Sequence, residues 1–232
     1  MPSDISFRAS AGFRLVTADP ARLAAFYRAI GFDVGAAATI PAAEMELLGL
    51  AGGGSRIAMS LGRSRVDLER FDHPGRPYSD DTTACDPIFQ HLALVTDDAE
   101  AAWRRASDAG AAPINRERPV TVPKSAGGVT AVKFRNPEGH PLEFLQFPRN
   151  GNAGWKGTGI LGIDHSAIAV RDVAASRRFY ARHGLSEAGA TVNHGPTQDA
   201  LDGPYGIEVE VVPIENRRQR ATSARIGRIA LI

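Results

Sequence analysis

The sequence predicts an α+β fold built from repeated βαβββ modules. Three segments carry one pattern, in which a short apolar run is followed by an aspartate, a helical stretch and a glycine; they begin at Gly12, His91 and His165. Further runs of strand length follow the helical stretch, such as "GGVTAVKFR" and "HPLEFLQF" in the second copy. Self-similarity of this kind indicates a duplicated structural unit.

The helix of each module has recognisable ends. Asp19 precedes Pro20, which is the pattern of an N-cap followed by proline at the first helical position, and Asp98 and Asp172 are equivalent caps. Apolar residues at helical spacing mark a buried face in the first copy: Leu23, Phe26, Tyr27 and Ile30. A glycine ends each predicted helix: Gly31, Gly110 and Gly184.

The chain divides into three predicted parts. Residues 10–148 hold two paired modules, 149–160 form a linker rich in Gly and Asn, and 161–232 hold a partial third module with a basic tail. No last strand is recognisable in the third copy before the arginines begin. The tail is either a solvated terminus or a patch for an acidic partner. No aromatic residues interleave with its arginines, so binding to nucleic-acid bases lacks support.

The composition is that of a soluble globular protein, with 43% apolar residues, 23% charged residues and a net charge of +1 over 232 residues. This balance gives no strong attraction to nucleic acid or to a membrane surface. No apolar run approaches the roughly 20 residues of a membrane helix, and the first residues lack a signal-peptide pattern. Cys85 is the single cysteine, which excludes a disulfide within one chain and favours the reducing cytoplasm.

Three features together resemble the vicinal oxygen chelate superfamily, which includes glyoxalase I, bleomycin-resistance proteins and extradiol dioxygenases. They are the spacing Asp-x6-Phe-Tyr-x3-Gly-Phe from Asp19 to Phe32, the strand that opens at His91, and "NPEGHPLEFLQF". The resemblance covers about residues 10–213 and implies that two modules pair into an incomplete barrel around a divalent metal ion. It also implies ligands on the first strand of a module (often His) and on the last strand (Glu). The metal then acts as a Lewis acid on two vicinal oxygens of the substrate.

Glu143 stands within the apolar last strand of the second module. Strand alternation places it on one face with Leu145 and Phe147, and a metal would offset the cost of burying the carboxylate if that face lines the barrel. By position, the resemblance implies that Glu143 and His91 are metal ligands. The alternatives are a solvent-facing glutamate and a histidine hydrogen-bonded to backbone.

The first module departs from the family pattern. Gly12 stands at the position of His91 and offers no side-chain ligand, whereas Asp67 aligns with Glu143 and is a third candidate metal ligand, or else a surface residue. His165 opens the third module as His91 opens the second. It resembles a ligand of a second site, or is a structural residue left over from duplication. An unpaired third module would expose a sheet edge, which predicts a homodimer with this module pairing across a two-fold axis.

The sequence thus predicts a metal-dependent lyase, isomerase or dioxygenase-like enzyme that acts on a small molecule. Its cofactor would be a divalent ion (Fe, Mn, Ni or Zn), and Glu143 is the catalytic candidate, acting as a base if it leaves the metal. The alternative is a non-catalytic binding protein, similar to bleomycin-resistance proteins, with a degenerate metal site. Gly12 and the missing fourth module favour that alternative.

Overall fold

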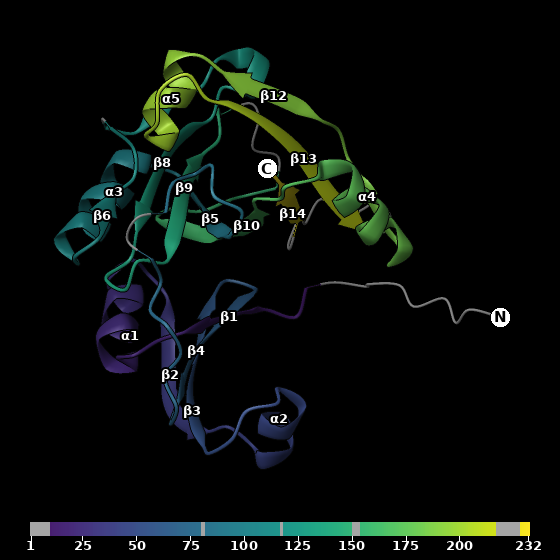
Figure 1. The fold of residues 1–232 in the computed structure, drawn as a ribbon. Helices are drawn as coiled ribbons and strands as arrows, with labels where there is room; N and C mark the ends of the chain where they lie inside the picture. The colour runs from purple at the N-terminus through teal and green to yellow at the C-terminus, as the bar shows by residue number, and fades with distance from the viewer. Residues whose placement is uncertain (1–9, 80–81, 117, 150–153, 217–227) are drawn as a thin grey trace.

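The computed structural model describes residues 10–79, 82–116, 118–149, 154–216 and 228–232 (Figure 1). Most of the predicted basic tail, including Arg217 and Arg225, lies outside the described residues. The first module contains β1 (Phe13–Val16), α1 (Pro20–Ala29), β2 (Asp33–Thr39), α2 (Ala42–Leu47), β3 (Gly54–Leu61) and β4 (Ser64–Phe71). The second contains β5 (Phe89–Thr96), α3 (Ala99–Asp108), β6 (Ala112–Pro113), β7 (Val120–Thr121), the 3₁₀ turn η1 (Lys124–Ala126), β8 (Thr130–Arg135) and β9 (Pro141–Gln146). The third contains β10 (Ile160–Ile168), α4 (Val173–Arg182), β11 (Leu185–Glu187), β12 (Thr191–His194), α5 (Pro196–Asp202), β13 (Glu208–Asn216) and β14 (Arg228–Leu231).

The predicted helix caps are confirmed in all three modules. The side chains of Asp19, Asp98 and Asp172 each accept a hydrogen bond from the backbone N–H three residues further on, which satisfies a donor that the first helical turn leaves free. The second residue after each of these helices has a positive φ, with values of 104°, 97° and 77°: Gly31, Gly110 and Gly184. Glycine adopts this conformation without steric cost, so the repeat preserves the same local reason for ending the helix.

The modules form two sheets in the described part of the chain. The first module forms a four-stranded sheet in the order β1-β4-β3-β2, and the second and third modules share a ten-stranded sheet with the central order β14-β10-β5-β9-β8. The shared sheet arises because β5 and β10, the first strands of their modules, pair antiparallel. The repeated α+β architecture is therefore confirmed, and the sheet curves without closing into a barrel (Figure 1).

The third module has a last strand that sequence patterns did not reveal. β14 pairs in parallel with β10, as β9 pairs in parallel with β5 in the second module. The module predicted to be unpaired thus has its first strand occupied on both sides within one chain, by β5 and by β14. β10 is therefore not an open sheet edge, which was the feature that predicted a dimer through this module.

The main hydrophobic core lies between the two sheets and joins the first two modules. Side chains from α1, including Phe26 and Tyr27, pack with Ala106 of α3 and with Leu142 and Phe144 of β9. Burial of this apolar surface stabilises the packing of the modules. The predicted linker at 149–160 falls between β9 and β10, and the division of the chain there remains a prediction. Among the described residues, no helix combines the length and apolar character that a bilayer crossing requires.

Candidate metal centre

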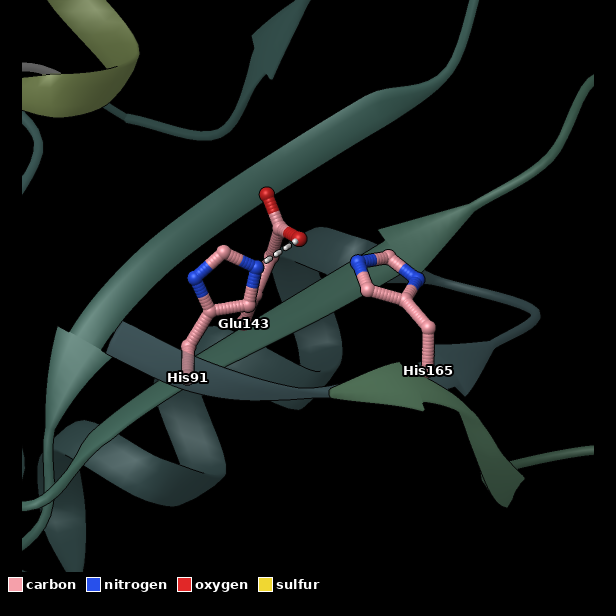
Figure 2. Close-up of side chains that lie close together, drawn as sticks. All are labelled: His91, Glu143 and His165. Atoms are coloured by element: carbon pink, nitrogen blue, oxygen red, sulfur yellow. Dashed lines mark ion pairs between the residues drawn. The ribbon is translucent and has the colours of Figure 1, made fainter. Parts of the chain in front are cut away.

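Three side chains converge on one face of the ten-stranded sheet: His91 of β5, Glu143 of β9 and His165 of β10. One ligand atom from each lies within 4.8 Å of the other two (Figure 2). The three strands are direct neighbours in the order β10-β5-β9, so backbone pairing fixes the spacing of the side chains. His91 and Glu143 are each 5% exposed, so the carboxylate is directed into the buried cluster and away from solvent.

Strand alternation on β9 sets the direction of Glu143. Leu142 and Phe144 belong to the core between the sheets, whereas Glu143, Leu145 and Phe147 line a cavity on the opposite face. The predicted common face of these last three residues is therefore confirmed. His91 and His165 line the same cavity.

His91 and Glu143 are in direct contact, with Nε2 of His91 3.2 Å from Oε2 of Glu143. Burial lowers the pKa of His91 below its usual 6.5, so the neutral imidazole is favoured at pH 7 although the carboxylate favours the charged form. Burial alone would raise the pKa of Glu143, but the charge that His91 carries when it is protonated at low pH, its hydrogen bond and Lys133 lower it to about 2. The pair thus offers an ionised carboxylate and a neutral imidazole, which are the protonation states that metals bind.

Lys133 lies on β8, directly across the ladder from Glu143. Its ammonium group contacts the Oδ1 atom of Asp202 on α5, and Gln198 donates a hydrogen bond of 2.5 Å to the other oxygen of the same carboxylate. Burial would lower the pKa of Lys133, but Asp202 and Glu143 raise it above its usual 10.5. This contact ties α5 to the sheet, and Lys133, Gln198 and Leu201 line the cavity beside the histidines.

The cavity has a volume of about 260 Å³. His91, Glu143 and His165 form one part of its lining, Thr191 and Asn193 of β12 add polar groups, and much of the remaining wall is apolar: Val122, Val129, Leu145, Phe147, Val209, Val211 and Ile229. Ligand sites commonly combine an apolar wall with a few placed polar groups, and this volume is slightly below the range of drug-sized pockets. The site is thus built for a small ligand.

The residues present fit a divalent cation. Ligand atoms on one ion at about 2.0–2.2 Å lie roughly 3–4.4 Å apart, close to the spacing observed here. Buried carboxyl groups around the cavity also outnumber the ammonium group of Lys133: Glu143, Asp164 and Asp202. A cation held by the two histidines and Glu143 would balance that excess of negative charge.

The structure does not bring Asp67 to this cluster. Asp67 lies on β4 of the four-stranded sheet, where its register matches that of Glu143: Asp67 pairs with Arg14, two residues after Gly12, as Glu143 pairs with Ala93, two residues after His91. The two carboxylates thus occupy corresponding positions of their modules, but their surroundings differ. Arg65 donates bidentate hydrogen bonds of 2.8 and 3.0 Å to Asp67, and these arginine contacts occupy the carboxylate that a cation would need.

The third ligand candidate in the structure is His165, whereas the sequence predicted Asp67 for that role. The signal was present, since His165 and His91 open equivalent strands, but pairing of β5 with β10 was needed to bring the rings to a centroid distance of 5.7 Å. The same register identifies the position related to Glu143 in the third module as Ala230, which pairs with Ala167, two residues after His165. The cluster therefore has two histidines and one carboxylate, with an alanine at the fourth position.

Comparison with solved structures supports the fold. Glyoxalase I from Zea mays is similar with a TM-score of 0.59 and 13% identity, over 94% of this chain and 64% of that chain. A proposed dioxygenase from Bacillus subtilis has a TM-score of 0.59 and 14% identity, over 97% and 64% of the two chains. A glyoxalase family protein from Bacillus cereus has a TM-score of 0.52 and 17% identity, over 61% and 95%. At these identities the likeness shows the fold, and this chain spans less than two thirds of the first two proteins.

A comparison with curated proteins gives no match. The family model described as Glyoxalase/Bleomycin resistance protein/Dioxygenase superfamily matches residues 11–144, which is more than half of the chain. The matched segment contains His91 and Glu143, and His165 lies beyond it. The chain belongs to the Glyoxalase/Bleomycin resistance protein/Dioxygenase superfamily.

Proposed function

We propose that this protein is a metal-dependent, dioxygenase-like enzyme that acts on a small and largely apolar substrate with two vicinal oxygens. The observation that supports this is the set of two histidines and one carboxylate in the wall of the cavity. This donor set, with further coordination positions open, is typical of non-haem iron(II) oxygenases. Glyoxalase-type lyase or isomerase activity belongs to the same superfamily and is the competing enzymatic reading.

In this proposal the chain holds the ion through Nε2 of His91, His165 and a carboxylate oxygen of Glu143. A bound divalent ion would supply Lewis-acid activation of the substrate oxygens and, if it is Fe(II), a place for dioxygen. Ala230, at the position related to Glu143, contributes no ligand and leaves room for the substrate on that side. Glu143 serves here as a ligand, because a carboxylate with a pKa of about 2 is a weak base at neutral pH.

The cavity walls favour the substrate class. Apolar side chains of β9 (Leu145), β13 (Val209 and Val211) and β14 (Ile229) line the cavity together with the three ligand candidates, and Leu201 of α5 lines it as well. A small aromatic diol such as catechol presents two adjacent oxygens on an apolar ring and matches this distribution. A bound apolar ring would exclude water from this wall and strengthen the electrostatic interactions of the three ligand candidates.

Oxygen uptake tests the proposal. The protein is loaded anaerobically with Fe(II) and mixed with catechol in an oxygen electrode, and wild type is compared with Glu143→Gln and His165→Ala. We expect uptake by wild type and a loss of at least about a hundredfold in both variants, since each removes a ligand. No uptake by the iron-loaded wild type across catechol and its methyl and carboxyl derivatives would reject the dioxygenase assignment.

A second candidate function is binding without catalysis. His91 and Glu143 satisfy one another at 3.2 Å without needing an ion, and Ala230 lacks a ligand atom. A protein that sequesters a small molecule in the 260 Å³ cavity would show these features. Ligand binding that is unchanged by a chelator and by His165→Ala would favour this candidate over the enzyme.

We also propose a homodimer, formed through the first module. In the described part of the chain β1 borders a single strand, β4, whereas β5 and β10 have neighbours on both sides. A broad hollow of about 820 Å³ lies along β1 and is lined by Phe13, Val16 and Phe71, and Val16 is 52% exposed. A second copy covering this region would bury apolar surface that a monomer leaves open.

The exposed thiol of Cys85 fits the reducing cytoplasm predicted from the sequence.

A further inference from the structure

Asp164 and His165 are neighbours in sequence, yet both side chains lie on the cavity face of β10. In a regular strand they would point to opposite faces. The register shows the cause: Ile163 pairs with Leu94 and His165 pairs with Ala93, so two steps on β10 oppose one step on β5. Asp164 is the extra residue of a β-bulge, a feature that changes the direction of side chains and often lies beside functional sites.

The bulge brings the Asp164 carboxylate to one specific atom. Oδ2 of Asp164 lies 3.0 Å from Nδ1 of His165. Asp164 is 6% exposed, so the contact is shielded from solvent. A carboxylate accepts a hydrogen bond and does not donate one, so Nδ1 carries the proton. The lone pair of His165 is then on Nε2.

Nε2 is the nitrogen that faces the cluster. Figure 2 shows one ring nitrogen of His165 directed toward Glu143 and the other directed away from it. With Nδ1 held by Asp164, the ring keeps both the orientation and the tautomer that a metal ligand requires. A free neutral histidine side chain favours the opposite tautomer, with the proton on Nε2, so protonation on Nδ1 has to be imposed by a partner.

We propose that Asp164 is a positioning residue for the metal centre, which fixes His165 as an Nε2 ligand by accepting the Nδ1–H hydrogen bond. This inference rests on the proposed metal site and adds a residue outside the three ligands. Carboxylate partners of metal-bound histidines typically contribute 10–100-fold to metal affinity. The role is specific to the third module, because the residue that precedes His91 in the second module is Gln90, which carries no carboxylate.

The test uses the full chain and two variants, Asp164→Ala and Asp164→Asn, with Asp72→Asn as a control carboxylate that accepts a hydrogen bond of 2.8 Å from Gly53 far from the site. The first readout is the tautomer of His165 in metal-free protein, from long-range ¹H–¹⁵N NMR spectra assigned with His165→Gln. We expect protonated Nδ1 in wild type and in Asp72→Asn. In Asp164→Ala we expect a shift toward protonated Nε2.

The second readout is calorimetric titration with Zn²⁺, which needs no turnover. We expect Asp164→Ala to weaken binding about 10–100-fold, Asp164→Asn to fall between it and wild type, and Asp72→Asn to stay within about twofold. An unchanged tautomer in Asp164→Ala, or unchanged affinity in a variant that is folded by circular dichroism, would overturn the inference. If Asp164→Ala does not fold, the isosteric Asp164→Asn decides by affinity. If the metal site itself is wrong, His165→Ala will also leave Zn²⁺ binding unchanged. This result distinguishes failure of the metal site from failure of the role of Asp164.

Discussion

Glu143 and His91 come from neighbouring parallel strands, and Oε2 of the glutamate lies 3.2 Å from Nε2 of the histidine, with both side chains buried in the wall of the cavity. Each side chain is the hydrogen-bond partner of the other, so neither needs an ion to compensate its burial. The same two atoms face the third ligand candidate, His165, so the pair is held ready to accept a cation (Figure 2).

The pair predicts an acid-dependent loss of stability. The pKa of Glu143 is lowered from 4.5 to about 2 in the folded chain, so its contribution is complete above about pH 4.5 and is lost as the pH falls toward 2. Glu143→Gln lacks this contribution. The difference in unfolding free energy between wild type and this variant is at most about 3 kcal/mol, and it should shrink from pH 5 to pH 3. Urea unfolding at several pH values measures it. Glu46→Gln, an exposed change, should show no such convergence; a constant gap for Glu143→Gln would argue against the pair.

Lys133 and Asp202 predict a coupled effect on α5. Asp202 is 2% exposed, so Lys133→Met leaves a buried carboxylate without its cation, at a cost of about 3–5 kcal/mol. The double variant Lys133→Met with Asp202→Asn should recover part of that loss, because the unpaired charge is gone. Urea unfolding and hydrogen exchange of α5 report the two effects, with Lys124→Met as a surface control. Equal destabilisation by the single and double variants would contradict the assigned contact.

Ala230 predicts a gain of metal affinity. Its register position is equivalent to that of Glu143, so Ala230→Glu places a fourth ligand at the cluster, whereas Ala230→Gln adds similar size without the charge. The buried carboxylate should lower the Tm of the metal-free variant, and Mn²⁺ should restore it. A tenfold gain in affinity corresponds to about 1.4 kcal/mol of additional metal-linked stabilisation. If Mn²⁺ shifts the Tm of the two variants equally, the proposed pseudo-symmetry of the site is wrong.

The first module predicts the oligomeric state. If a second copy covers the exposed side of β1, sedimentation equilibrium at micromolar concentration should give twice the chain mass of 24.7 kDa. Val16→Lys introduces a charge at an exposed edge position and should shift the protein toward monomer. Val192→Lys, at a similarly exposed position of β12, is the matched control and should leave the mass unchanged. A monomeric wild type would reject the dimer.

Local features were readily predicted from the sequence. The caps at Asp19, Asp98 and Asp172 and the alternation around Glu143 depend on residues close in the chain, and both are confirmed. Sheet partners could not be predicted in the same way. The first strands of all three modules have similar apolar patterns, so nothing local distinguishes pairing of β5 with β10 from other pairings.

The same limit explains the difference at the site. Asp67 and His165 were both candidates by position, and register shows that Asp67 does correspond to Glu143. The sequence does not show that Asp67 lies beside Arg65 on one sheet. It also does not show that His165 lies beside His91 on the other sheet. The bulge at Asp164 also leaves no periodic signal, because a single extra residue becomes visible only against a paired strand.

The metal content of protein purified without chelator, and after loading with Fe(II) or Mn²⁺, tests the central claim most directly. We expect about one equivalent per chain in wild type and in Asp67→Asn, and below about a tenth of an equivalent in His91→Ala and His165→Ala, because each histidine supplies one of three ligands. A wild type that stays below a tenth of an equivalent after loading, or a His165→Ala variant that keeps its full equivalent, would contradict the account.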